Sequence, residues 1–440
     1  MKMKKLTSLL LASVMVLSML AGCGNKADAP NSEPPASNPP ASQPADDNKE
    51  PAPAGKEYDG VTLTMWSMWS SGEPQANVIS EAAAAFEEKT GAKVNIEFKG
   101  RDVNKVLAAS LEAKDNIDII EDDYKRIGTV YQDFTMDLTD MAKAAGYEEF
   151  SYQCFTDQSI AWCGFLNAIT EQPNVGGIFY DKDAFEKAGI TAEPKTWAEF
   201  LDVCQKLKDA GVGPLAQDSA YCDFAFYHTL VRYLGEDKIE ELTLNGGWSG
   251  TAAEQAAQDI IDLRNSGFLA DGAPDEFPSS QNKIGFEQAA MVICADYVTA
   301  EVNGNTGREI NWGLFNYPTV EGGADNGAAY MGANSLAITS YSENGQAAFD
   351  FIMFLTTGEM GQKLADQAHQ IPADSRNTAP ADLTGTIETL KAAQSPMTWC
   401  ASLSVNADLK DTIKSMCTEL FEGKYADGAA FCAAMDALYK

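Results

Sequence analysis

Aromatic and acidic side chains gather at the ends of the strands that the sequence predicts. They are Trp66 and Trp69 at the strand 61–66, Glu121, Asp122, Asp123 and Tyr124 after the strand 117–120, Asp296 and Tyr297 after the strand 291–294, and Trp399 before the last helices. In open α/β sheets, ligands bind beyond the carboxyl ends of the strands. Flat rings offer apolar faces to sugar C–H groups, and carboxylates accept hydrogen bonds from hydroxyl groups. The pattern indicates a hydroxyl-rich ligand, although any single ring could pack in the core and the acidic run could be a solvated turn.

The elements that position these residues alternate between strand and helix. Strands are predicted at 61–66, 94–98, 117–120, 177–180, 289–294, 312–315 and 335–339, and helices at 74–90, 103–111, 185–188, 196–211, 251–266, 343–356, 409–421 and 429–438. Such alternation is typical of a mainly parallel sheet with helices on its faces. Capping boxes are expected at Thr196–Glu199 and Thr251–Glu254, and Trp197 is expected in the core. We predict two α/β lobes that the chain crosses more than once.

The composition of the 440-residue chain is globular but strongly acidic. Apolar residues make up 45% and charged residues 22%, and 64 Asp and Glu outnumber 32 Lys and Arg, for a net charge of −32. This surface repels phosphate backbones and anionic lipids, so nucleic-acid binding and a polybasic membrane contact are disfavoured. Only His228 and His369 occur, without an HExxH motif, which argues against a catalytic metal site. No cofactor is expected.

Motifs of common enzyme classes are absent from the sequence. It has no GxxxxGK[ST] phosphate loop, no GxSxG nucleophile elbow, no EF-hand spacing and no GxGxxG after a strand. A glycoside hydrolase needs only two carboxylates, which no motif can exclude among 64 acidic residues. A binding protein without enzymatic activity is therefore the main hypothesis, and a secreted glycoside hydrolase is a minor alternative.

The beginning of the chain predicts export and a lipid anchor. Lysines at the start precede an uncharged, mainly apolar stretch and the sequence Leu20-Ala21-Gly22-Cys23, which resembles the bacterial lipobox. Residues 24–57 hold eight of the eighteen prolines and too few large apolar residues to fold. We predict a signal peptide at 1–22, a diacylated Cys23 and a linker over 23–57. The working part then begins near Tyr58 and faces away from the cytoplasm.

The other eight cysteines show no CxxC spacing, so zinc and thioredoxin chemistry are unsupported. An exported protein permits disulfides, but several of these cysteines lie on apolar helix faces. Buried free thiols are the expectation, and Cys154 with Cys163 is the first pair to check.

Several segments resemble one family in the same order along the chain. They are Phe86–Val94, Gly177–Ile190, Pro194–Phe200, Lys206–Gly211, Phe286–Met291 and Gly332–Ile338. Together they are similar to the family 1 extracellular solute-binding proteins of bacterial ABC importers, over roughly residues 58 to 440. The resemblance implies a two-lobed clamshell of the periplasmic-binding-protein type II, with lobe 1 at 58–172 plus 328–372 and lobe 2 at 173–327 plus 373–440. Hinges are expected near 170–176, 322–330 and 370–376.

The resemblance also implies which residues contact the ligand. By position these are Trp66 and Trp69 at the rim, Asp122 and Asp123 as hydroxyl acceptors with Tyr124 beside them, Tyr221, Tyr297 and Trp399 as stacking rings, and Asp296, Asn334 and Arg376. Tyr297 stands where the family has Trp, which changes the stacking surface. Gln288-Ala289 replaces Gly-Lys, at a place expected outside the pocket.

The implied function is capture of a sugar or oligosaccharide and its delivery to an ABC permease. The strong negative charge disfavours an anionic ligand and suits a neutral sugar. It also suits a cation such as a polyamine, because acids and aromatic rings can cage cations. The protein is expected to be a monomer, anchored outside the cell membrane by Cys23.

Overall fold

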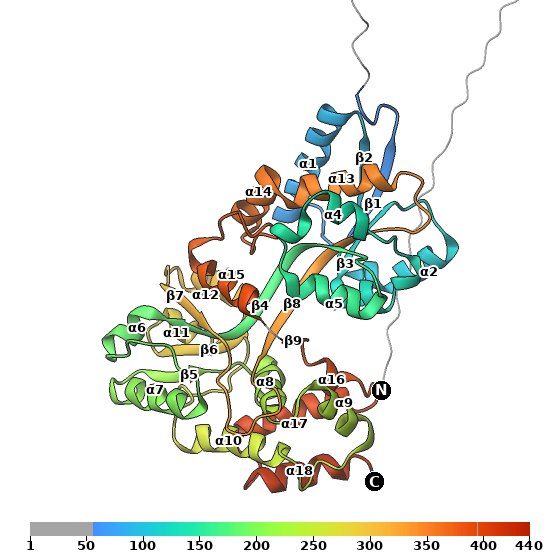
Figure 1. Cartoon of the computed structure of the whole chain (residues 1–440). Helices are drawn as coiled ribbons and strands as arrows, with labels where there is room; N and C mark the ends of the chain where they lie inside the picture. The colour runs from blue at the N-terminus through green and yellow to red at the C-terminus, as the bar shows by residue number, and fades with distance from the viewer. Residues whose placement is uncertain (1–55, 394) are drawn as a thin grey trace, which may run out of the picture. The chain divides into compact units, whose positions relative to one another are not determined.

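The computed structural model describes residues 56–393 and 395–440, which belong to one compact unit (Figure 1). The predicted signal peptide at 1–22, Cys23 and nearly all of the linker lie outside the described residues. Within those residues, no helix combines the length and the apolar character needed to cross a bilayer.

Strands in the described residues form one mixed sheet in the order β2-β1-β3-β8-β4-β6-β5, with β7 paired to β4 and β9 to β8. The strands are β1 Thr62–Ser67, β2 Lys93–Phe98, β3 Ile119–Asp123, β4 Ile169–Asp181, β5 Gly213–Ala216, β6 Ala289–Ala295, β7 Trp312–Phe315, β8 Ala328–Ile338 and β9 Ser395–Met397. The predicted strand positions are confirmed, but β4 and β8 extend well beyond the predicted ranges.

Helices pack against this sheet and against one another. In chain order they are α1 Pro74–Thr90, α2 Leu107–Ala113, α3 Tyr124–Thr129, α4 Thr139–Ala144, α5 Gln153–Cys163, α6 Lys182–Lys187, α7 Trp197–Asp209, α8 Cys222–Leu234, α9 Glu236–Asn245, α10 Ala253–Asn265, α11 Asn282–Gly285, α12 Tyr297–Thr306, α13 Gly345–Thr356, α14 Gly358–Ala368, α15 Thr384–Ala392, α16 Ala401–Ser404, α17 Lys410–Glu422 and α18 Gly428–Ala437. Short 3₁₀ turns join them: η1 Arg101–Lys105, η2 Gln132–Phe134, η3 Tyr147–Glu149, η4 Ser219–Tyr221 and η5 Ala381–Leu383.

Local signals explain where several helices begin and end. Pro74 opens α1, where its missing N–H costs nothing, and Gly91 ends it in the left-handed conformation with a φ of 86°. The capping box of Thr196 and Glu199 is present at α7. The second expected box is not formed. The hydroxyl of Thr251 accepts a hydrogen bond from the N–H of Ala253, and α10 begins at Ala253.

The two long strands β4 and β8 run antiparallel and link two groups of elements. The first part of β4 pairs with β8 from Ile169↔Leu336 to Gly176↔Tyr330, and its second part pairs with β6 and β7. At its other end β8 pairs antiparallel with β3. The sheet is therefore mixed rather than mainly parallel, because β4 and β8 run antiparallel to each other and to β3, β6 and β7.

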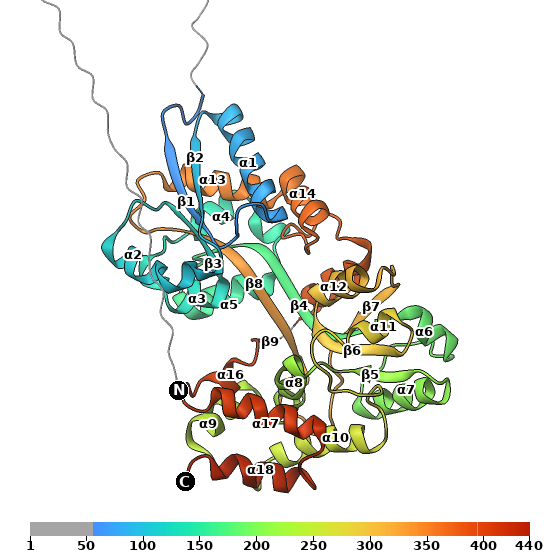
Figure 2. The same cartoon turned by 180° about the vertical axis from the view of Figure 1, so that it is seen from behind.

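Each group of elements has its own apolar core. We call β1–β3 with α1, α13 and α14 the first lobe, where Phe86 and Phe351 pack in the core. We call β5–β7 with α7, α8, α10, α17 and α18 the second lobe, where Phe226 and Phe431 pack in the core. Both views show β4 and β8 running between the two lobes (Figures 1 and 2). The exact lobe boundaries stay a prediction.

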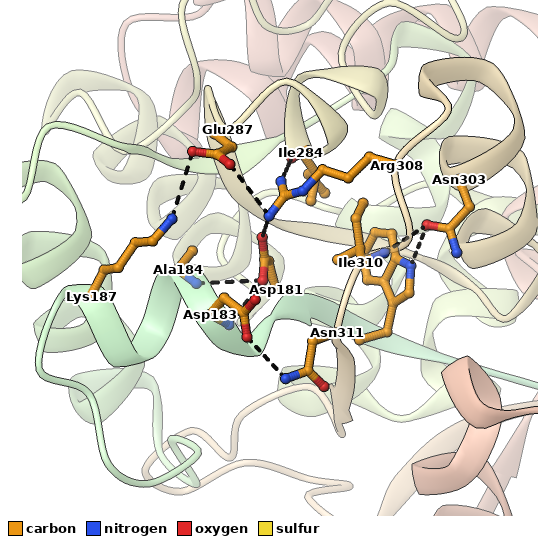
Figure 3. A network of polar contacts seen from close by, with 11 residues as sticks. Asp181, Asp183, Ala184, Lys187, Ile284, Glu287, Asn303, Arg308, Ile310 and Asn311 are labelled. Atoms are coloured by element: carbon orange, nitrogen blue, oxygen red, sulfur yellow. Dashed lines mark hydrogen bonds and ion pairs between the residues drawn. The ribbon is translucent and has the colours of Figure 1, made fainter.

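A polar network holds the end of β4 in the second lobe (Figure 3). The carboxylate of Asp181 caps α6 by accepting from the N–H of Asp183 at 2.9 Å. The guanidinium of Arg308 lies 3.1 Å from this carboxylate and 3.7 Å from that of Glu287. Glu287 in turn lies 3.6 Å from the amine of Lys187. These contacts tie β4 to the segments that flank β6 and β7.

All eight described cysteines are free, and six of them are buried. The Sγ of Cys154 faces the carbonyl of Leu390 at 3.8 Å, and that of Cys163 faces the carbonyl of Gly128 at 3.2 Å. The two thiols of the pair singled out in the sequence thus have different partners, which confirms the expectation of free thiols for the described residues.

Candidate functional site

A cavity of about 160 Å³ lies between the first lobe and the segment that follows β9. Its lining comes from the end of β3 and the start of α3, from the first part of β8, and from the start of α16. The lining residues are Asp123, Tyr124, Lys125, Arg126, Tyr330, Met331, Gly332, Thr398, Trp399 and Ala401. This pocket brings polar groups of one lobe opposite an aromatic ring that packs on the other.

Trp399 is the centre of a cluster of aromatic rings. Its indole stacks on the ring of Phe224 in α8, with 4.0 Å between the centroids. Tyr330 of β8 meets it edge-on at 5.5 Å, and Tyr221 does the same at 6.0 Å. Tyr297, at the start of α12, lies 6.5 Å away. One face of Trp399 is thus covered by Phe224, and its orientation is set by rings from three other elements.

The polar side of the pocket is organised by Asp122, at the end of β3. Its side chain is 1% exposed, and both oxygens accept from Nε of Arg126, at 3.2 and 3.1 Å. The phenol of Tyr131 donates to the same carboxylate at 3.2 Å. The side chain of Arg126 lines the pocket and is 39% exposed, so the buried Asp122 fixes the position of a guanidinium that a ligand can still reach. Such charge-assisted pairs fix geometry as well as adding energy.

Asp123 caps α3 and lines the pocket directly. Its Oδ1 accepts from the N–H of Arg126 at 3.0 Å, as expected for an N-cap residue. Burial raises the pKa of the Asp123 carboxyl above its usual value. The pocket therefore offers one carboxylate acceptor beside the donors of Arg126 and Lys125, which suits a ligand with both donor and acceptor groups.

Of the residues predicted for the site, Asp122 holds Arg126 at this pocket, and five others lie in or beside it. Asp123, Tyr124 and Trp399 line it, and Tyr221 and Tyr297 contact the Trp399 ring. Tyr124 is buried, and its hydroxyl faces the carbonyl of Met331 at 3.4 Å. The rule that ligands bind at strand ends thus located the edge of the sheet where these side chains meet.

Trp66 in β1 and Trp69 just after it lie elsewhere, with cations over their rings. Trp69 is 5% exposed, and the guanidinium of Arg101 lies 4.3 Å from the ring centroid. Arg101 is itself fixed by an ion pair with Glu73 at 2.7 Å. Trp66 is half-buried under the amine of Lys99, at 3.9 Å. Neither ring is among the residues that line this pocket, and each has a cation over one of its faces.

Three further predicted residues lie outside the pocket lining, and two of them bond to β4, one of the strands that link the lobes. Oδ1 of Asp296 accepts from the N–H of Val175 in β4 at 3.0 Å, and burial raises its pKa to about 6. The amide of Asn334 in β8 donates to Gln172 in β4 at 2.9 Å. The guanidinium of Arg376 pairs with Asp374 and lies 3.9 Å from the ring of Phe150.

Arg126, Lys125, Tyr330 and Phe224 are the site residues that the sequence prediction missed. The spacing of Asp122 and Arg126 by four residues, across the start of a helix, is a signal that could have found the ion pair. Tyr330 belongs to the part of β8 that was not predicted as strand. Phe224 is fully buried and contacts both Trp399 and Tyr330, which line the pocket.

The sequence from residue 69 to residue 362 matches the bacterial extracellular solute-binding protein family. The chain belongs to this family. A relative described as a probable ABC transporter-binding protein, from Deinococcus radiodurans, is 25% identical over 325 residues, 66% of this chain and 71% of the relative. The melibiose/raffinose/stachyose-binding protein MelE of Bacillus subtilis is 21% identical over 336 residues, 72% of this chain and 75% of MelE.

Among solved structures, the apo form of RafE from Streptococcus pneumoniae has a TM-score of 0.68 at 16% identity, covering 88% of this chain and 98% of RafE. At this identity the likeness concerns the fold, and it confirms the predicted two-lobed α/β class. Membership of an extracellular solute-binding family confirms the resemblance seen in the sequence.

Proposed function

We propose that the protein is the extracytoplasmic binding component of an ABC importer, which captures a sugar or oligosaccharide between its lobes and delivers it to a permease. The observation that carries this proposal is the pocket itself. The aromatic ring of Trp399, the carboxylate of Asp123 and the guanidinium of Arg126 line one cavity of about 160 Å³. Sugars present apolar C–H faces and hydroxyl edges, which these groups match. The ligands in the name of MelE support the same class.

Capture follows from contacts to both lobes. A ligand that touches both sides stabilises the closed arrangement by its differential affinity for it. The hinges then lie near 170–176, 322–330 and 370–376, with lobe 1 at 58–172 plus 328–372 and lobe 2 at 173–327 plus 373–440. Small-angle scattering should show a smaller radius of gyration with saturating ligand, and an unchanged profile would contradict this mechanism.

The lining of the pocket supports binding rather than catalysis. Hydrolysis of a glycoside uses two carboxyl groups on either side of the bond, and Asp123 is the single carboxylate in the described lining. Incubation with oligosaccharides should therefore produce no new reducing ends.

A cationic ligand is the second reading, favoured by Asp123 together with Trp399 and Tyr330. Lys125 and Arg126 line the same pocket and would repel a cationic ligand, because like charges repel most strongly where water is excluded. We therefore rank a neutral carbohydrate above a polyamine.

The proposed localisation of the protein depends on the segment before Tyr58. We propose that cleavage before Cys23 and its diacylation anchor a monomeric protein on the outer face of the cell membrane. Its partners are then the carbohydrate and the permease subunits, with no membrane contact other than the lipid.

A thermal-shift panel of monosaccharides, oligosaccharides and polyamines tests the ligand class. A ligand at 100 times its Kd adds about 2.7 kcal/mol to the free energy of unfolding. We expect stabilisation by one or more carbohydrates and none by spermidine or putrescine. Stabilisation by a polyamine alone would mean that the ligand is a cation and not a carbohydrate.

A further inference from the structure

Phe277 is an aromatic side chain that the folded second lobe leaves open to water. It is 41% exposed, and its ring meets that of Tyr221 edge-on, with 5.7 Å between the centroids. Tyr297, also beside Tyr221 at 6.2 Å, is 36% exposed. Large apolar side chains that stay exposed beside one another commonly mark binding surfaces.

The backbone around Phe277 is held in place on both sides. Oxygens of the buried Asp218 carboxylate accept from the N–H groups of Ser280 and Gln281, at 2.9 and 3.1 Å. On the other side, the N–H of Ser219 donates to the carbonyl of Asp275 at 2.7 Å. These bonds tie the segment to the turn that carries Tyr221, so Phe277 is presented at a defined place. A rigid aromatic platform loses little entropy when a ligand covers it.

Trp399, Tyr221 and Phe277 contact one another in sequence, and we call these three rings the aromatic row; Tyr297 lies beside both Tyr221 and Trp399. Trp399 lines the pocket, the ring of Tyr221 lies 6.0 Å from the ring of Trp399, and the exposed ring of Phe277 lies 5.7 Å from that of Tyr221. The row therefore begins in the pocket and ends at the surface of the second lobe.

The size of the pocket indicates what the rest of the row is for. Its volume of about 160 Å³ is well below the range of roughly 300–1,000 Å³ that encloses drug-sized ligands. It has room for a small part of an oligosaccharide, while the remaining sugar units would lie outside it. The aromatic row supplies apolar faces where those units would lie.

We propose that the ligand is an oligosaccharide of at least three sugar units, with an inner unit at Trp399 and an outer unit against Phe277. This rests on the proposed carbohydrate-binding function and adds to it the length of the ligand. Phe277 then determines specificity for chain length, because shorter sugars do not reach it.

Isothermal titration calorimetry on the full chain tests the proposal. The probes are melibiose, raffinose and stachyose, together with malto-, cello- and xylo-oligosaccharides of two to four units. In the series that binds, we expect the affinity to rise about tenfold or more from the disaccharide to the trisaccharide or tetrasaccharide. Phe277→Ala should lose this gain and keep the affinity for the disaccharide.

Phe286→Ala is the matched control, since Phe286 is 56% exposed on the same lobe and no ring contact joins it to the row. It should bind every sugar as the wild type does. If affinity does not depend on length, or Phe277→Ala binds the longer sugars like the wild type, this proposal is wrong while carbohydrate binding stands. If none of the sugars binds, the proposed function is wrong and this proposal fails with it.

Discussion

The indole of Trp399 stacks on the ring of Phe224, with 4.0 Å between the centroids and 9° between the planes. Phe224 is fully buried in α8 and so has a fixed position. The short segment after β9 is thereby anchored to the second lobe through its aromatic side chain. The ring is oriented before a ligand arrives, which reduces the entropy lost on binding.

Trp399→Ala should weaken sugar binding by about 2 kcal/mol, or roughly 30-fold, because it removes a preorganised stacking face and leaves a wet hollow. Calorimetry on the folded variant measures this. Trp197→Ala is the control, since Trp197 packs on Phe200 and Tyr317, at 5.2 and 5.8 Å, away from the pocket lining. It should lower stability and leave the Kd unchanged. Equal affinities of Trp399→Ala and the wild type would contradict the assignment of the pocket.

Asp122→Asn should lower sugar affinity by roughly 1.5–3 kcal/mol, because the carboxylate positions Arg126. The double variant with Arg126→Gln separates this role from direct contact. If Asp122 acts through Arg126, the double variant loses no more than the larger of the two single losses. Additive losses in calorimetry would mean that Asp122 contacts the ligand independently.

Much of the fold could be predicted from local patterns. The capping box at α7, the short strand β7 and the helices α17 and α18 match their predicted positions closely, since each depends on local periodicity and capping. The length of β4 did not follow from its sequence. It contains Pro173 and two glycines, which favour turns, and it has a bulge between Thr170 and Gln172. Pairing with β8 overrides this local preference.

The site was harder to predict than the fold. The strand-end rule pointed to the edge of the sheet where the pocket lies, yet it did not say which side chains line that pocket. Trp69 is covered by Arg101, which comes from a separate segment, and Asp122 faces Arg126 instead of the pocket. Such partners are brought together only by the tertiary fold, so residue type and spacing could not identify them.

Cys23→Ala should release the protein from membranes, because the proposed acyl chains are its anchor. Fractionation of cells with a high-salt wash measures the change, and the wild type should stay in the membrane pellet. Sedimentation of the variant with membranes after that wash would contradict the lipoprotein proposal.

Glu121 and Glu171 form a buried acidic pair at the edge of the first lobe. Both side chains are fully buried, on β3 and on the bulge of β4. Burial raises the pKa of Glu121 to about 7, and burial with the nearby charge of Glu121 raises that of Glu171 well above its usual value. The amide of Gln370 donates to the carbonyl of Glu171 at 3.1 Å. The pair therefore retains protons near neutral pH.

Glu171→Gln should stabilise the protein at pH 8 and have little effect at pH 5. For an acid whose pKa is raised in the folded state, the folded chain binds more protons than the unfolded chain above pH about 4.5, so stability falls as pH rises toward the folded pKa. Gln is neutral throughout and escapes this loss, so the stability of the variant relative to the wild type should rise from pH 5 to pH 8. Urea unfolding at pH 5, 6.5 and 8 measures the difference from the wild type.

Glu88→Gln, on the exposed side of α1, is the control and should show no pH-dependent difference. A difference for Glu171→Gln that is the same at all three pH values would show that the pair carries no extra protons in the folded state.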